Sequence, residues 1–251
     1  MEQNLKSRLA AGEAVITSWS KIPHPSSIEV LGLAGLDAVI LDAEHSPFDR
    51  ASIDLSILAG RAAGIPVLVR TLTATVHELQ TALDMGAAGV VVPHVRSAPE
   101  ARDIVRACRF EPSGRGYSSA TRAGGYTTKP AAAHRMAHQD LLLIAQIEDA
   151  EALDNLDEIV GTDGIDAVLI GQADLAVSLG VSQDDPALDQ AVEQIVDACA
   201  RAARPFGVYL AHHGSLAQWR ARGAGLFIVS SDQGFILAGA RALAQSVNEI
   251  R

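Results

Sequence analysis

The chain alternates between short apolar runs and longer segments in which apolar residues recur at helical spacing. Eight apolar runs have the length and composition of strands buried on both faces. They are Ala14–Trp19, Asp37–Asp42, Pro66–Arg70, Gly89–Pro93, Leu141–Glu148, Asp166–Gly171, Pro205–Leu210 and Gly225–Ser231. Helical patterning covers Ser26–Ala34, Asp49–Ala63, Thr75–Met85, Ala98–Cys108, Ala150–Val160 and Asp189–Ala203. Eight alternating β/α units predict an α/β protein with a (β/α)8 TIM barrel fold.

Glycine-containing breaks such as Gly35 and Gly64 often separate a predicted helix from the following strand, as helix C-terminal signals do. A doubly wound sheet is the competing fold, but its Gly-rich dinucleotide fingerprint is missing. A length of 251 residues fits one barrel better than two unrelated domains. We therefore expect a single barrel domain over residues 1–251.

One interval, between Arg109 and Gln139, breaks the alternation. Its first half is rich in Gly, Ser and Thr, and it carries Arg115, Tyr117 and Arg122. We predict a long functional loop at the catalytic rim of the barrel. The alternative is a disordered surface insertion.

Composition narrows the range of partners. Aromatic residues make up only 4% of the chain, so the core must consist of Ala, Val, Leu and Ile. A net charge of −10 argues against a nucleic-acid partner, because a basic footprint is absent. No run approaches 18 uninterrupted apolar residues, and residues 1–12 lack the apolar core of a signal peptide, so we expect no membrane partner. Cys108 and Cys199 form neither a CxxC motif nor a secreted framework, which indicates a reducing, cytoplasmic location.

Two acids follow predicted strands that are consecutive in the chain. Glu148 ends the segment Gln146-Ile147-Glu148, and Asp174 ends Gly171-Gln172-Ala173-Asp174. The carboxyl ends of neighbouring parallel strands open into the same mouth, where carboxylates supply hard oxygen ligands to a cation such as Mg²⁺. A bound cation there polarises a carbonyl and stabilises an enolate. The alternative is a pair of rim carboxylates satisfied by backbone amides or arginine.

A polar cluster begins where the second predicted strand stops, with Asp42, Glu44 and His45. His45 exchanges protons near neutral pH, and Asp42 or Glu44 would orient and charge it. The alternative is a helix-entry cluster in which Asp42 or Ser46 caps the helix. The coincidence of this cluster with the acids that follow the fifth and sixth predicted strands favours catalysis.

Arg70 ends the third predicted strand, which is otherwise apolar. A guanidinium there binds a carboxylate or the oxygen of a developing enolate. The alternative is an Arg that neutralises Glu44, Asp42 or Asp84, and a structural pair can also pre-organise a catalytic arginine. Glu44, Asp84 and His94 are expected to support the site from a second shell.

The positions of the lysine residues help to exclude one class of enzyme. Lys129 lies in the irregular interval, and we place no lysine at the end of an apolar strand, which argues against a Schiff-base enzyme.

The stretch Phe235–Val247 is Ala- and Leu-rich and amphipathic, so it either closes the barrel or docks on a neighbouring subunit.

These segments together resemble the metal-dependent class II pyruvate aldolases of the 4-hydroxy-2-oxoheptanedioate (2,4-dihydroxyhept-2-ene-1,7-dioate) aldolase family, over nearly the whole chain. The residues that carry the resemblance are 41–47 (LDAEHSP), 69–71 (VRT), 83–89 (LDMGAAG) with Pro93, 114–116 (GRG), 146–148 (QIE) and 170–175 (IGQADL). The resemblance implies a (β/α)8 barrel of the pyruvate-binding type that assembles as a homo-oligomer. The implied assembly is a hexamer, a trimer of dimers, whose last helix is exchanged between neighbours.

The resemblance also implies roles for single residues. Glu148 and Asp174 would bind a divalent cation (Mg²⁺, Mn²⁺ or Co²⁺), which pyruvate would chelate through its keto and carboxylate oxygens. His45 would be the acid/base group, assisted by Asp42, and Arg70 would stabilise the enolate and aldehyde oxygens. The pyruvate carboxylate would be held by Gln146 and by the backbone near Ala173 and Asp174.

The implied reaction is reversible aldol cleavage of a 4-hydroxy-2-oxo acid to pyruvate, or a close 2-oxo acid, and an aldehyde. Ser46 and Phe48 depart from the family pattern, so the aldehyde preference is left open. Two alternatives remain: an acyl-CoA lyase of the citrate lyase beta or malyl-CoA type, and a non-catalytic barrel that binds an oxoacid.

Overall fold

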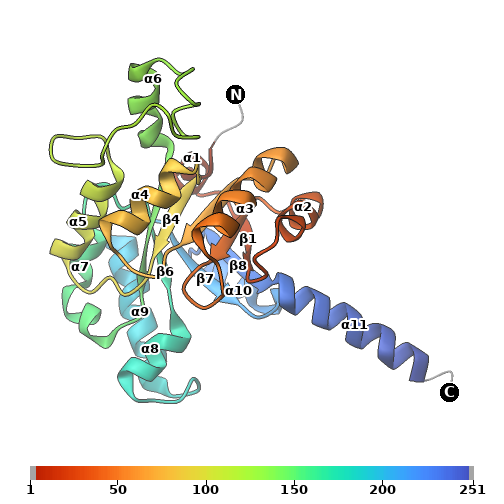
Figure 1. Cartoon of the computed structure of the whole chain (residues 1–251). Coiled ribbons are helices and arrows are strands. Elements are labelled where there is room, and N and C mark those ends of the chain that lie inside the picture. Colours follow the sequence, from red (N-terminus) through yellow and green to blue (C-terminus); the bar gives the residue numbers. More distant parts are fainter. Residues whose placement is uncertain (1–3, 249–251) are drawn as a thin grey trace.

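In a computed structural model that describes residues 4–248, eight parallel strands close into a barrel (Figure 1). Each strand pairs with its successor in the chain, and β8 pairs with β1, which confirms the predicted (β/α)8 barrel. The strands are β1 (Val15–Ser20), β2 (Ala38–Asp42), β3 (Val67–Arg70), β4 (Gly89–Val92), β5 (Leu142–Ile147), β6 (Ala167–Ile170), β7 (Phe206–Leu210) and β8 (Leu226–Ser231).

Helices fill the connections between the strands. The α-helices are α1 (Leu5–Ala10), α2 (Pro25–Leu33), α3 (Arg50–Ala63), α4 (Val76–Asp84), α5 (Ala98–Cys108), α6 (Ala131–Met136), α7 (Leu156–Val160), α8 (Gln172–Leu179), α9 (Pro186–Arg201), α10 (Leu216–Ala221) and α11 (Asp232–Asn248). Three short 3₁₀ helices are η1 (Ala137–Asp140), η2 (Ala150–Asn155) and η3 (His213–Ser215). The helix predicted over Ala150–Val160 therefore starts as η2 and continues as α7.

Local sequence sets the ends of helix α3. At its start, the Asp49 side chain accepts the backbone N–H of Ser52, while the Ser52 hydroxyl accepts the backbone N–H of Asp49, a reciprocal capping box. At its end, Gly64 adopts a left-handed conformation with φ of 70°, which costs glycine little because it has no Cβ.

The barrel core consists of alternating strand residues. Ile40, Leu68 and Ile144 belong to the apolar cluster inside the barrel, whereas Leu41 and Val69 pack under the surrounding helices. Both sets are buried, so the strands lack the polar alternation of a half-exposed sheet. This agrees with the predicted core of small and branched aliphatic residues.

The irregular interval after Arg109 lies at the opposite end of the barrel from the mouth, so the prediction of a loop at the catalytic rim is wrong. The interval connects the carboxyl end of α5 to the start of β5, and this connection must run along the amino-terminal face. Figure 1 shows α6, which belongs to it, at the far end of the molecule from α8. Arg122 anchors the interval with an ion pair to Asp54 at 2.7 Å and a hydrogen bond to the Met85 carbonyl at 2.9 Å.

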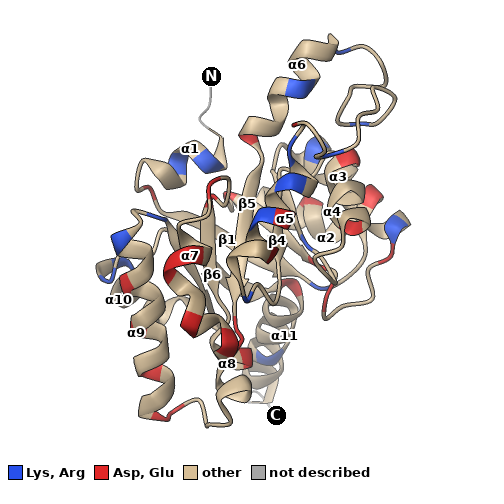
Figure 2. Cartoon of the chain, turned by 90° about the vertical axis from the view of Figure 1, so that its left-hand side faces the viewer, with Lys and Arg blue, Asp and Glu red and all other residues tan. Residues whose placement is uncertain are grey.

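Charged residues cover the helices around the barrel, with Lys and Arg on α1 and α6 and Asp and Glu on α7 (Figure 2). Acidic residues occur at both ends of the barrel: Asp84 and Asp140 lie at the amino-terminal end of the strands, and Glu44 and Glu148 lie at the carboxyl-terminal end.

Helix α11 projects away from the barrel (Figure 1). It carries exposed apolar side chains, among them Phe235, Ile236, Leu243 and Val247. Of the two expectations for this stretch, closing the barrel is therefore wrong. Within residues 4–248, no helix has the combined length and apolarity needed to cross a membrane.

Candidate active site

Two neighbouring strand ends hold an arginine and an aspartate face to face. The register of β2 and β3 pairs Asp42 with Arg70. Both Nε and Nη2 of Arg70 donate to Asp42 Oδ1, at 3.0 and 2.6 Å, and Arg70 Nη1 lies 3.0 Å from Glu44 Oε2. The Trp19 ring lies 4.4 Å from the guanidinium carbon, so the arginine is held between a π-face and two carboxylates. This is the pairing that the sequence left open as a structural alternative, and it also fixes the orientation of Arg70.

Asp42 is fully buried and lies between two cations. Lys21 Nζ is 2.9 Å from Asp42 Oδ2. Burial alone would raise the pKa of Asp42, but Arg70 and Lys21 overcome it, and the net effect is a lowered pKa. Asp42 therefore stays ionised at neutral pH.

Lys21 had no role in the expected site. It follows β1 directly. The signal was present in the sequence, but the run was taken to stop at Trp19, which left Lys21 looking like a loop residue.

His45 is not oriented by Asp42 through its ring. The contact between the two is a hydrogen bond from the backbone N–H of His45 to Asp42 Oδ1, at 3.1 Å. The imidazole is half exposed, and its Nε2 lies 3.8 Å from Glu44 Oε2. Glu44 is thus the carboxylate nearest to the ring, and the ring remains open to solvent or substrate.

Glu148 is a buried carboxylate at the end of β5. It accepts hydrogen bonds from the Gln146 side-chain amide and, at 2.9 Å, from the backbone N–H of His94. Burial raises the pKa of Glu148, and these hydrogen bonds only partly offset that rise. The other amide atom of Gln146, Oε1, is buried and has no hydrogen-bond partner within residues 4–248. A buried, partly satisfied carboxylate beside a free amide oxygen is a set of hard donors suited to Mg²⁺.

A glycine brings Glu148 against the start of helix α8. β5 and β6 pair so that Glu148 lies beside Gly171, and a Cβ built on Gly171 would come within 2.7 Å of Glu148 Oε2. Asp174 lies in the first turn of α8, half-buried. Within the described chain no side chain caps this helix, so first-turn N–H groups are available to a carboxylate.

β5 and β6 are neighbouring strands, so Gln146 and Glu148 lie on the strand next to the one that leads into α8, and the first turn of α8 carries Ala173 and Asp174. The residues present fit a divalent cation with open positions, because two acids and neutral oxygens leave most of an octahedral shell to water and substrate.

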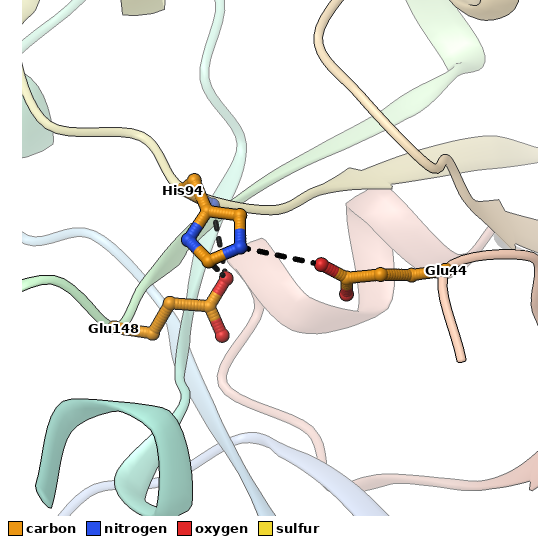
Figure 3. Close-up of side chains that lie close together, drawn as sticks. All are labelled: Glu44, His94 and Glu148. Atoms are coloured by element: carbon orange, nitrogen blue, oxygen red, sulfur yellow. Dashed lines mark hydrogen bonds and ion pairs between the residues drawn. The ribbon is translucent and has the colours of Figure 1, made fainter. Parts of the chain in front are cut away.

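His94 bridges the two halves of the mouth (Figure 3). Its Nε2 lies 3.4 Å from Glu44 Oε1, and its Nδ1 lies 3.0 Å from Asp149 Oδ2. One ligand atom from each of Glu44, His94 and Glu148 lies within 4.8 Å of the other two. Burial opposes a positive charge on the ring, but Asp149, Glu148 and Glu44 outweigh it and raise the pKa of His94. A left-handed φ of 55°, uncommon for a non-glycine residue, places it there. The sequence argument gave His94 only a supporting role.

Asp84 does not join this mouth within the chain. It ends α4 at the opposite face of the barrel, where it pairs with Arg115 of the irregular interval. The expected second-shell role is therefore not supported by its position, because α4 begins at the mouth and runs away from it.

Comparisons with known proteins agree with this geometry. A model of the family described as HpcH/HpaI aldolase/citrate lyase matches residues 16–237. The chain is 35% identical over 231 residues to the hydroxypyruvate/pyruvate aldolase of Roseovarius nubinhibens, with 90% of each chain covered. It is 31% identical over 244 residues to the 5-keto-4-deoxy-D-glucarate aldolase of Shigella dysenteriae, covering 96% of this chain and 95% of that protein.

Among solved structures, an HpcH/HpaI aldolase/citrate lyase family protein from Burkholderia cenocepacia superposes with a TM-score of 0.92. It is 29% identical, and the match covers 97% of this chain and 98% of that one.

Proposed function

The chain belongs to the HpcH/HpaI aldolase/citrate lyase family, and on this premise we propose that Glu148 and Asp174 bind its catalytic metal while Arg70 and His45 handle the substrate. The enzyme is a class II aldolase that cleaves a 4-hydroxy-2-oxo acid to pyruvate and an aldehyde. The observation that carries the assignment of the site is the buried carboxylate of Glu148, pressed against Gly171 beside the uncapped start of α8.

The residues around Glu148 and Asp174 would bind the 2-oxo acid end of the substrate. Bound there, Mg²⁺, Mn²⁺ or Co²⁺ would supply Lewis-acid polarisation of the 2-oxo group. The first-turn N–H groups of Ala173 and Asp174 would donate to the substrate carboxylate, supported by the positive end of the α8 dipole. Gln146 has its Oε1 unpaired within the described residues and would orient the ligands there.

Residues on the opposite side of the mouth would stabilise negative charge on the substrate and transfer its protons. The Arg70 guanidinium, held in a fixed orientation, would donate to the oxygens on which negative charge develops as the carbon–carbon bond breaks. His45 Nε2 would take the proton of the 4-hydroxyl group, directly or through one water, and would deliver it to C3 of the enolate to form pyruvate. Asp42 stays anionic between Arg70 and Lys21, so it would position these groups rather than transfer protons.

We propose a sugar-acid-derived substrate. One relative is named for hydroxypyruvate and pyruvate and another for 5-keto-4-deoxy-D-glucarate, so a polyhydroxylated 4-hydroxy-2-oxo acid is the substrate class to test first. We also propose that the enzyme works in the cytoplasm, since Cys108 and Cys199 are both buried and unbridged.

We further propose a hexameric homo-oligomer in which α11 docks on a neighbouring subunit. An apolar cavity of about 740 Å³ lies between α2 and the start of α11, lined by residues that include Val30, Leu31, Phe235 and Ile236. Such a contiguous apolar surface is typical of a subunit contact.

The decisive experiment measures pyruvate release from a panel of 4-hydroxy-2-oxo acids, with added divalent metal and with a chelator. We expect the chelator to abolish turnover, excess metal to restore it, and borohydride with pyruvate to leave no covalent adduct. Glu148→Gln should lower kcat/KM by more than about 100-fold because a metal ligand is lost. The control Glu151→Gln changes an exposed acid three residues away and should retain activity. Full activity in the presence of chelator, or a trapped imine, would refute the mechanism.

A further inference from the structure

Lys21 contacts the buried carboxylate of Asp42, a contact that the sequence did not indicate. Its Nζ lies 2.9 Å from Asp42 Oδ2, and its side chain is 27% exposed while that of Asp42 is fully buried. The other oxygen of Asp42, Oδ1, is the one that receives the two hydrogen bonds from Arg70. Asp42 therefore joins Lys21, which directly follows β1, to Arg70 on β3.

Lys21 balances the charge of the buried mouth. Asp42 and Glu44 both lie against the single guanidinium of Arg70, so these three groups alone carry a net negative charge. A buried carboxylate that shares its only cation is unstable as an anion. The ammonium of Lys21 brings the sum of the formal charges of the four groups to zero.

The backbone of Lys21 is also fixed in place. Its N–H donates to Asp232 Oδ1 at 2.9 Å, and the N–H of Ile22 donates to Asp232 Oδ2 at 3.0 Å. The hydroxyls of Ser20 and Ser27 donate to the same Oδ2, at 3.0 and 2.7 Å. Asp232 is buried, so Lys21 is held at both its backbone and its ammonium, unlike a mobile surface lysine.

We propose that Lys21 is a positioning residue of the aldolase: its ammonium holds Asp42, and Asp42 in turn holds the guanidinium of Arg70 against the substrate oxygens. This inference rests on the proposed function of Arg70. The role proposed for Lys21 is not that of a Schiff-base nucleophile, because its Nζ is engaged by Asp42 Oδ2 at 2.9 Å.

Kinetics of matched variants test the proposal. We expect Lys21→Met to lower kcat/KM by about 10- to 100-fold at saturating metal through kcat, because Arg70 is no longer held in place. Lys21→Gln should show a similar loss, and Lys21→Arg should recover most of the activity. The matched control is Lys6→Met, which removes a lysine of similar exposure (34%) that also pairs with a nearly buried aspartate, Asp166, at the other end of the barrel. It should retain activity.

The pH dependence of kcat/KM separates a positioning role of Lys21 from a merely structural one, because only the positioning role predicts a shift. The charged groups around Asp42 are Lys21, Arg70 and, within its own loop, Glu44, with the half-exposed His45 donating its backbone N–H. In Lys21→Met the acidic limb of kcat/KM should shift to higher pH, since Asp42 accepts a proton more readily without its second cation.

A second measurement needs neither substrate nor metal. The chain has two tryptophans, and Trp19 lies under Arg70. In a Trp219→Phe background, Trp19 fluorescence should change between the parent and Lys21→Met but not between the parent and Lys6→Met. If no substrate on the panel releases pyruvate, the proposed function fails, and the fluorescence still decides the role of Lys21. Unchanged emission with kcat/KM within about twofold of the parent would overturn the positioning role. Borohydride trapping of pyruvate on Lys21 would overturn it as well.

Discussion

Arg70 is shared between Asp42 and Glu44, and this sharing decides what each carboxylate can do. Asp42 also has Lys21, so it remains an anion and fixes geometry. Glu44 has Arg70 on one oxygen and His94 on the other, with the ring of His45 nearby. Of the acids at this side of the mouth, Glu44 is therefore the one that lies near both imidazoles.

The variant Arg70→Lys tests whether Arg70 acts through its positive charge alone or also through the geometry of its hydrogen bonds. A lysine keeps the positive charge but cannot donate two parallel hydrogen bonds to Asp42 Oδ1, so we expect kcat/KM to fall by about 100-fold. Arg201→Lys is the control, because Arg201 makes the same two-pronged contact to Asp157 on the exposed surface. Steady-state kinetics of both variants decide the matter, and equal activity of the two would contradict the role given to Arg70.

The two cysteines predict how stability changes at alkaline pH. Burial raises the pKa of the Cys108 and Cys199 thiols from 9.0 to about 12. The folded state thus holds these protons more tightly than the unfolded chain, so their contribution is complete below pH 9 and falls as pH rises above it. The loss is at most about 1.4 kcal/mol per pH unit for each thiol. Urea unfolding from pH 8 to 10.5 should show a steeper decline for the parent than for a Cys108→Ala, Cys199→Ala double variant. Parallel declines would contradict this assignment.

Sequence reasoning found the charged residues that end strands and offered Asp42 and Glu44 as partners of Arg70, but it did not find the contacts of Lys21 and His94. Asp42, Arg70 and Glu148 stand out because each interrupts an apolar run. Lys21 and His94 do not, because one follows a serine that still belongs to β1 and the other reaches the mouth only through a left-handed backbone conformation. Pair contacts between different strand ends depend on side-chain direction, which a single sequence does not specify.

At the level of elements, the junction between β6 and α8 is the most constrained part of the mouth. Gly171 leaves room for the Glu148 side chain, and the following turn presents its N–H groups and Asp174. The irregular interval after α5 is a contrasting case. Its glycines and arginines suggested a catalytic loop, but chain order alone settles its place, since a segment that leads from a helix into a strand lies on the amino-terminal face of a barrel.

Gly171→Ala tests this junction. A methyl group there would lie 2.7 Å from both Cβ and Oε2 of Glu148, so the carboxylate must move away from α8. We expect metal affinity measured by calorimetry to fall by at least about tenfold. Gly225→Ala serves as the control, because a Cβ at that position meets only ordinary contacts of 3.5 Å. Unchanged metal affinity in Gly171→Ala would mean that Glu148 is not a ligand.

For the whole molecule, the barrel was predictable because eight buried runs and the helices between them repeat the same unit. The proposed assembly does not follow from that pattern; it is supported by α11, which projects away from the barrel (Figure 1) and carries exposed apolar side chains.

Ile236→Asp should disrupt the proposed hexamer. Ile236 is 63% exposed in the single chain and lines the apolar cavity beside α2, so a buried charge at a subunit contact would oppose docking. Light scattering should show a smaller particle than the parent, whereas Arg241→Gln, a polar change on the same helix, should leave the mass unaltered. A monomeric parent would contradict the proposed assembly outright.

The continuous ring of hydrogen bonds around the barrel has a consequence for how such molecules can meet. Every one of the eight described strands is flanked on both sides, so the sheet offers no template onto which a foreign strand could be added. Growth by edge pairing, the usual route to amyloid-like fibres, is closed to the native molecule. Any specific self-association must therefore proceed through helices or loops.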